Sequence, residues 1–203
     1  MKKTVMTVLL SGVLFAGCSH SQTNNILLQE WNTPYQTIPF SKIKTSDYMP
    51  AFKEAINQHN KEIDSIINNK EKPTFKNTIV ALDLSGNLLN RVSGVFFNMT
   101  GSNTNKDMQA LEEVISPMIA KHNDEVMMNE QLFNRVKTVW DNKSKENLNE
   151  EQEMLLTKTY KKFLRSGALL DNSHKDALKK VNEEITKLET KYNANVLAQT
   201  KSY

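Results

Sequence analysis

The sequence predicts an all-α protein, built as an array of several helices. Through most of its length apolar residues recur at three- and four-residue spacing, which is the pattern of helices that bury one side. No alternation of apolar and polar residues is long enough to predict a β-strand. Polar capping residues, prolines and glycines separate the periodic segments and indicate where helices begin and end.

The segment before the first helix differs from the rest. Residues 19–25 are polar and aperiodic, which predicts a flexible tether. Ile26–Phe40 contains Trp31, Tyr35 and two prolines, and it predicts an extended arm whose aromatic side chains pack on a neighbouring surface.

The first two helices are expected over Ser46–Asn68 and Thr74–Met99. Ser46 can cap the first helix, and Pro50 is tolerated in its opening turn. The second includes Gly86 and Gly94, which a helix tolerates at a cost of about 1 kcal/mol each. Its apolar side carries Phe75, Ile79, Leu82, Leu89, Val92 and Phe96.

Four more helices are expected after the glycine-containing loop that follows. Their predicted ranges are Lys106–Met128, Leu132–Trp140, Asn149–Gly167 and Ser173–Ala198, with Asn149 and Gln152 matching a capping box. The last helix carries one apolar stripe, which predicts packing against partner helices. The stripe consists of Leu178, Val181, Ile185, Leu188, Tyr192 and Val196.

The first residues predict export. Lys2 and Lys3 precede a mostly apolar run, Val5–Ala16, that is too short to cross a bilayer, which takes about 20 apolar residues. This pattern is typical of a secretory signal peptide, assigned to residues 1–17. The small residues before Cys18 resemble the bacterial lipoprotein box, in which the cysteine becomes lipidated. The alternative is an ordinary signal peptide followed by an incidental cysteine.

Lipidation of Cys18 sets the expected organisation. Because Cys18 is the sole cysteine, its acylation would leave no thiol for a disulfide, a zinc site or a nucleophile. Residues 18–25 are then the lipidated cysteine and tether, and residues 26–203 a helical domain that is incomplete at its C-terminal end. Ser19, rather than aspartate, resembles the pattern that permits transport to the outer membrane, so we expect a membrane-anchored lipoprotein facing the periplasm.

The charge balance excludes one class of partner. Loss of Lys2 and Lys3 with the signal peptide would reduce the 26 basic residues to 24, against 23 acidic ones. No stretch concentrates Lys and Arg without interleaved acidic residues. Nucleic-acid binding needs a basic surface, so no nucleic-acid partner is expected.

No catalytic or metal-binding constellation is predicted. His59 and Glu62 share one helical face and could offer two metal ligands, but such pairs are common by chance. His122 is expected at a solvent-facing, charged helix end. The chain contains no His-Glu-x-x-His zinc motif and no Gly-x-Ser-x-Gly nucleophile elbow. The expected catalytic and metal residues are therefore none.

Beyond single motifs, the chain resembles a known family over residues 26–203. The resemblance is carried by Leu27–Tyr35, Ile38–Ile43, Tyr48–Phe52, Pro73–Leu82 and Leu89–Ser93, followed by Phe96–Asn98, Ser116–Pro117, Lys121–Asp124, Thr159–Tyr160 and Phe163–Ala168. These segments are similar to the N-terminal part of bacterial peptidyl-dipeptidases, also called dipeptidyl carboxypeptidases, of the thimet oligopeptidase family.

The resemblance implies a large helical zinc peptidase that removes dipeptides from the C-termini of oligopeptides. In that family two helical lobes enclose a channel, and the zinc site with its His-Glu-x-x-His motif belongs to the C-terminal half. That motif has no counterpart here, so the chain corresponds to the N-terminal lobe, with zinc and the oligopeptide substrate implied only for the full-length enzyme. The alternative hypothesis is a free-standing helical lipoprotein that binds peptides or a protein partner.

Overall fold

The computed structural model describes residues 25–200. The predicted signal peptide and Cys18 lie outside the described residues. Within residues 25–200 every regular element is helical and no strand occurs, which confirms the all-α prediction. No helix in this part of the chain is long and apolar enough to cross a membrane.

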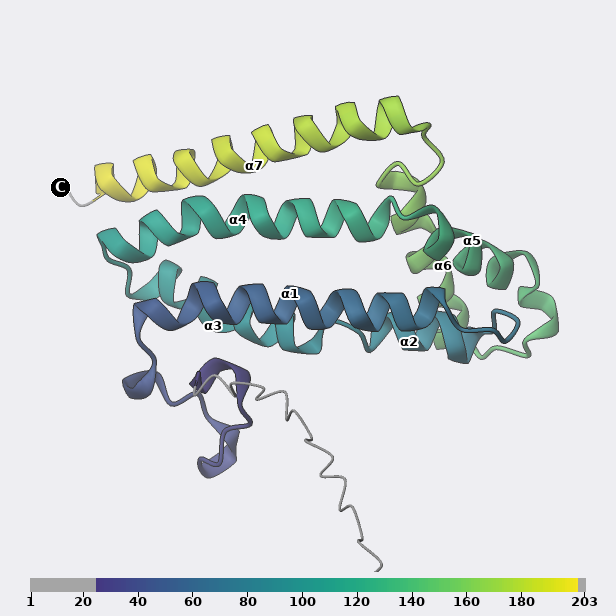
Figure 1. The fold of residues 1–203 in the computed structure, drawn as a ribbon, viewed down its shortest axis with the longest axis horizontal. Helices are drawn as coiled ribbons and strands as arrows, with labels where there is room; N and C mark the ends of the chain where they lie inside the picture. Colours follow the sequence, from purple (N-terminus) through teal and green to yellow (C-terminus); the bar gives the residue numbers. More distant parts are fainter. Residues whose placement is uncertain (1–24, 201–203) are drawn as a thin grey trace, which may run out of the picture.

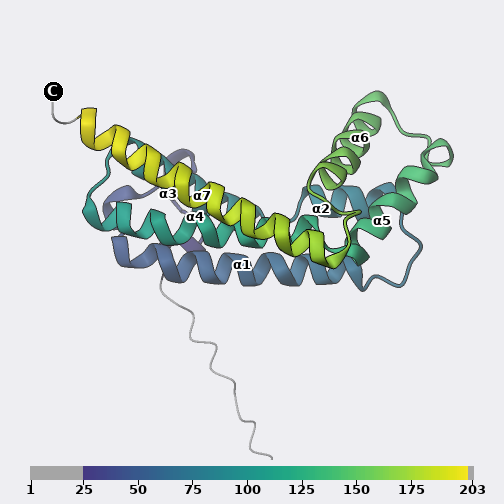
Figure 2. The ribbon, with the colours of Figure 1, turned by 90° about the horizontal axis from the view of Figure 1, so that it is seen from above.

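The α-helices are α1 (Thr45–Ile67), α2 (Ala81–Asp83), α3 (Asn87–Ser102), α4 (Lys106–Met127), α5 (Glu130–Asp141), α6 (Glu150–Arg165) and α7 (Asn172–Thr200). Helices α1, α3, α4 and α7 run along the length of the molecule, and α2, α5 and α6 gather at one end (Figure 1). Seen from above, α6 stands at an angle to the layer formed by α1, α4 and α7 (Figure 2).

Asparagine caps begin three of the helices. The side chains of Asn105, Asn129 and Asn149 each accept a hydrogen bond of 2.9 Å from a backbone N–H in the first turn of α4, α5 and α6, respectively. Such a bond satisfies a donor that the helix itself leaves free. The predicted capping box of Asn149 and Gln152 is confirmed, because the Gln152 side chain also accepts from the Asn149 N–H.

The predicted single helix over Thr74–Met99 is wrong. A π-helical segment, η4 (Phe75–Val80), and the short α2 come first, and the chain then turns before α3 begins at Asn87. At the turn Gly86 has φ 72°, a left-handed conformation that interrupts an α-helix. The break allows the two apolar halves of this region to enter two different clusters.

The two clusters form the core at opposite ends of α1. One contains Phe52 of α1 with Val92, Phe96 and Ile115 of α3 and α4, and it also covers Leu27 of the N-terminal arm. The other combines the end of α1 with η4, α5 and α6, through Ile63, Ile66, Phe75, Ile79, Leu132, Val136, Leu156 and Phe163.

The N-terminal arm is made of short 3₁₀ turns rather than a purely extended chain. These are η1 (Ile26–Leu28), η2 (Pro34–Gln36) and η3 (Phe40–Lys42). Trp31 packs as predicted, with the Arg91 guanidinium 5.3 Å from its ring centre. Tyr35, in contrast, is 99% exposed, so the predicted packing of both aromatic rings is only half right.

Candidate functional site

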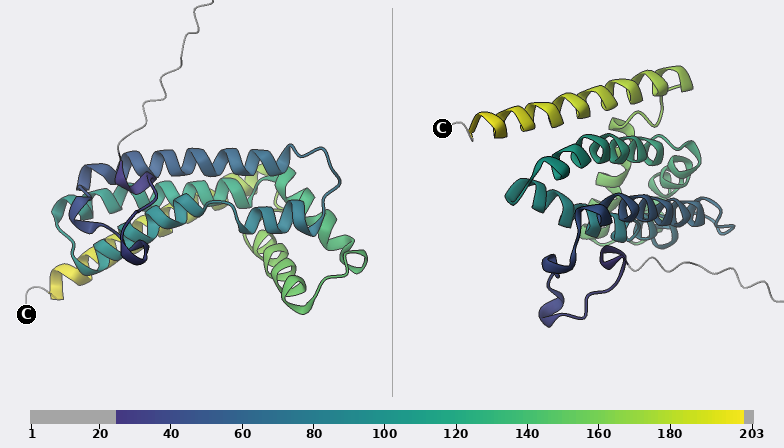
Figure 3. Two further views of the ribbon diagram at one scale, coloured as in Figure 1. Left: turned by 90° about the horizontal axis from the view of Figure 1, so that it is seen from below. Right: turned by 60° about the vertical axis from the view of Figure 1, so that its left-hand side comes forward.

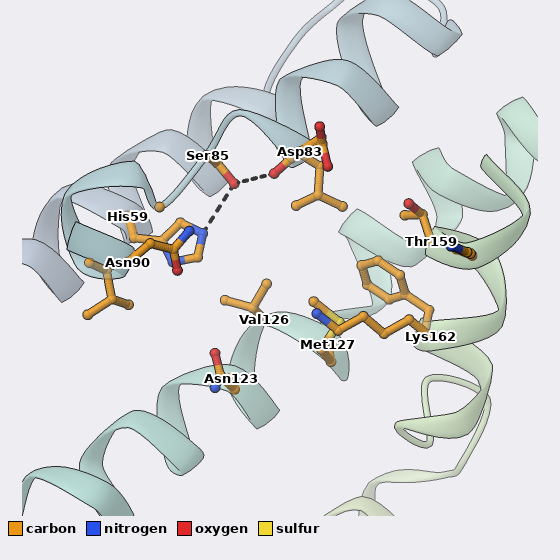
Figure 4. A pocket seen from close by; sticks show the side chains of 14 residues that line it. His59, Asp83, Ser85, Asn90, Asn123, Val126, Met127, Thr159 and Lys162 are labelled. Carbon is orange, nitrogen blue, oxygen red and sulfur yellow. Dashed lines mark hydrogen bonds between the residues drawn. The ribbon is translucent and has the colours of Figure 1, made fainter. Parts of the chain in front are cut away.

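A pocket of about 320 Å³ lies where α1, the turn between α2 and α3, α4 and α6 meet (Figure 4). Its polar lining comes from each of these elements and includes His59, Ser85, Asn123 and Lys162. Its apolar lining consists of Leu82, Leu89, Val126, Met127 and Phe163. The pocket is therefore assembled from segments that are far apart in the sequence.

A chain of hydrogen bonds runs from this turn into the core through Ser85, His59 and His122. Ser85 Oγ lies 2.7 Å from the Leu82 carbonyl oxygen, which can only accept, so the hydroxyl proton is donated there. Ser85 Oγ then accepts from His59 Nε2–H at 3.2 Å. Nδ1 of the neutral His59 ring therefore carries no proton, and it accepts a hydrogen bond of 2.8 Å from Nε2–H of His122. Because the Leu82 carbonyl oxygen can only accept, this pattern of hydrogen bonds places the proton of each neutral imidazole on Nε2.

This series of hydrogen bonds ends at Nδ1 of His122. The residue is 2% exposed, and this nitrogen has no hydrogen-bond partner among the described residues. A proton there would place a buried charge without an acceptor, which is strongly unfavourable. A proton on His59 Nδ1 would set two N–H groups against each other, provided that His122 keeps its proton on Nε2. The observed contacts therefore favour two neutral imidazoles.

The electrostatics of the two rings agree with this assignment. Burial lowers the pKa of His59, and the nearby charge of Glu62 opposes part of that change. Burial also lowers the pKa of His122; the charge of His59 adds to the effect and Glu125 opposes it. Both rings are consequently uncharged at neutral pH.

Gly86 and Glu62 fix the turn beside the pocket. The Gly86 N–H donates to Glu62 Oε2 at 2.7 Å, and Gln58 donates to Glu62 Oε1 at 3.0 Å. A Cβ atom on Gly86 would lie 3.1 Å from the His59 ring. The missing side chain therefore allows the turn to approach the imidazole closely.

The structure gives the sequence-based metal candidates other roles. His59 and Glu62 do share one side of α1, but both hydrogen-bond to the turn between α2 and α3. Within residues 25–200 no group of three or more His, Cys, Asp or Glu side chains could hold a metal ion. His174 lies apart from the pocket, where its Nδ1 contacts exposed Asp171 at 2.7 Å.

The expectation that His122 faces solvent is wrong. His122 lies seven positions after Ile115, three after Ile119 and four before Val126. At this spacing it falls on the same side of α4 as these apolar residues. This spacing predicts that His122 is buried, whereas its charged neighbours Asp124 and Glu125 favour a solvent-facing helix end. No local signal identifies Ser85 as a partner of His59.

The arrangement can bind a ligand but is not built for nucleophilic catalysis. A nucleophilic serine needs a histidine that accepts its proton, whereas here His59 donates to Ser85 and the serine proton is held by Leu82. The remaining polar groups around the pocket include two cations, Lys158 and Lys162, two amides, Asn90 and Asn123, and the carboxylate of Asp83. Such a lining suits a polar group.

Comparison with known proteins gives the site its context. No protein-family model matches the sequence. The chain is 37% identical over 180 residues to the dipeptidyl carboxypeptidases of Salmonella typhimurium and Escherichia coli, which is 89% of this chain and 26% of each relative. It is 22% identical over 181 residues to organellar oligopeptidase A of Arabidopsis thaliana, of which it covers 22%. These matches confirm the resemblance to the family: over most of its length the chain is related to the dipeptidyl carboxypeptidases, and it spans about a quarter of their length.

Proposed function

We propose that this chain is the N-terminal helical part of an exported, zinc-dependent peptidyl-dipeptidase, an enzyme that releases dipeptides from the C-termini of oligopeptides. The observation that carries the proposal is the 37% identity over 89% of the chain to two dipeptidyl carboxypeptidases. The all-helical fold agrees with the helical lobe that the resemblance implies.

The described residues do not fit a zinc site, because they offer no group of three or more ligands. We therefore assign no catalytic step to this segment. Its proposed role is to wall one side of the substrate channel. The pocket lined by Lys158, Lys162 and Asn123 is then a candidate contact for polar groups of a peptide.

Reading the gene beyond the codon for Tyr203 gives a direct test. We expect a continuous reading frame that contains a His-Glu-x-x-His motif. A natural stop after Tyr203, with no such motif downstream, would remove the enzymatic half of the proposal and favour a free-standing lipoprotein that binds peptides or a protein partner.

A chimera tests the same proposal biochemically. Residues 26–200 would replace the matching segment of the Escherichia coli dipeptidyl carboxypeptidase, and dipeptide release from short peptides would be measured. Dipeptide release by the chimera supports the proposal. A soluble chimera that releases no dipeptide, beside an active unaltered enzyme, contradicts it.

We also propose that Cys18 anchors the protein to a membrane as an exported lipoprotein, at the outer membrane facing the periplasm. The support is the sequence before Cys18. Labelling with a radioactive fatty acid in a bacterial host should mark the unaltered chain in the membrane fraction, and Cys18→Ser should abolish the label. Retention of the label in the variant would contradict the assignment.

A further inference from the structure

The outer side of α7 carries an apolar stripe that no described residue covers. Its members are Val181, Ile185, Leu188, Tyr192 and Val196, whose exposed fractions range from 47% to 68%. They follow one another at intervals of four and three residues and span about 22 Å along the helix, at 1.5 Å per residue. The sequence predicts that this stripe, together with Leu178, packs against partner helices. Leu178 is partly buried near Gly167, but the other five residues remain largely exposed within residues 25–200.

The helix contacts α4 through a different and mostly polar side. Asn182 donates to both carboxylate oxygens of Asp124 at 3.0 Å, and the partly buried Thr186 and Thr190 lie one and two turns further along. At 100° per residue these positions are about a third of a turn around the helix from the apolar stripe. Figure 1 shows α7 as the outermost helix beside α4, and Figure 3 shows the same from another direction.

This arrangement departs from the usual amphipathic pattern. A surface helix normally places its apolar stripe against the core and its polar side in water. On α7 the polar side is packed and the apolar stripe faces outward. Contiguous exposed apolar surface of this kind marks a site of contact with another polypeptide, a membrane or a ligand. Leu188, Glu189, Tyr192 and Asn193 also surround a shallow hollow that a partner side chain could enter.

We propose that the apolar stripe of α7 is the docking surface for the remaining part of the peptidase, the polypeptide that the related dipeptidyl carboxypeptidases have beyond the quarter matched here. The inference rests on the proposed function. It is supported by the 26% of each relative that the chain spans, because most of such a protein is then absent from this structure and available to cover the stripe.

The test compares Leu188→Lys with Glu184→Gln. Both raise the net charge by one, and Glu184 is an exposed residue on the neighbouring charged side of α7. In the 203-residue chain alone neither change should shift the unfolding temperature, because Leu188 is already 57% exposed. In the chimera with the Escherichia coli enzyme, Leu188→Lys should lower the unfolding temperature by several degrees, and Glu184→Gln should leave it unchanged.

The possible outcomes separate the two proposals. A chimera without peptidase activity contradicts the proposed function. An active chimera whose unfolding temperature is the same with and without Leu188→Lys contradicts the docking surface alone. Light scattering on the chain by itself should show a monomer. A dimer that Leu188→Lys dissociates would assign the stripe to a second copy of this chain and overturn the proposal.

Discussion

Nε2 of His122 lies 2.8 Å from Nδ1 of His59, and this hydrogen bond joins α4 to α1 between residues 63 positions apart in the chain. Ser85 extends the connection to the turn between α2 and α3. Three separate elements are therefore held together by two imidazoles whose burial lowers their pKa and favours their neutral forms.

The first prediction concerns pH. The pKa of both histidines is lowered in the folded state, whereas an unfolded histidine titrates near 6.5. Above that value both states are neutral and stability is unaffected. As the pH falls below about 6.5, the unfolded state takes up protons first, so stability should decrease by at most about 1.4 kcal/mol per pH unit for each histidine. Urea unfolding at pH 7.5, 6.5 and 5.5 measures this dependence.

A double variant isolates the two histidines. His59→Gln with His122→Gln should flatten the dependence between pH 7.5 and 5.5, even where it lowers stability at every pH. His174→Gln, at a largely exposed position, is the control and should leave the dependence in place. An unchanged slope in the double variant would show that other groups cause it.

The second prediction concerns the turn at Gly86. Gly86→Ala forces a side chain into a left-handed backbone conformation and against the His59 ring, so we expect a loss of about 1–2 kcal/mol from the conformation alone. Gly94→Ala is the matched control, because it lies within α3 and its Cβ would meet no atom within 4 Å. It should increase stability by about 0.5–1 kcal/mol. Equal effects in chemical denaturation would contradict the assigned role of Gly86.

The third prediction concerns Arg135, a buried cation of α5. It donates to the Asn69 carbonyl oxygen at 2.9 Å and to the Asn77 side chain at 3.3 Å, which fixes the segment between α1 and η4. Arg135→Met should cost about 1–3 kcal/mol, since partly buried acceptors lose their donor. Lys137→Met, which removes an exposed partner of Asp141, should change the free energy of unfolding little. A comparable loss in both variants would argue against a special role for Arg135.

The fourth prediction concerns activity. The purified 203-residue chain should bind no zinc tightly and release no dipeptide from short peptides, because its sequence lacks the His-Glu-x-x-His motif. Isothermal titration with zinc and an assay of peptide cleavage check the two statements. Metal-dependent dipeptide release by this chain alone would refute the assignment of catalysis to the part of the related enzymes that this chain does not match.

The sequence by itself determined the all-α class, most helix boundaries and the capping box of Asn149 and Gln152. These features depend on residues within a few positions of one another, so periodicity and local hydrogen bonding are sufficient to predict them. The segments that resemble peptidyl-dipeptidases were likewise a property of the order of residues alone.

Only the tertiary structure decided three other features. The second predicted helix is broken at Gly86 and its two halves enter different clusters, His122 hydrogen-bonds to His59, and α7 turns a polar side toward Asp124. Each depends on a partner at least 58 positions away or on a core assembled from several helices. Spacing along one helix indicates which residues share a side, but not which side the rest of the protein covers.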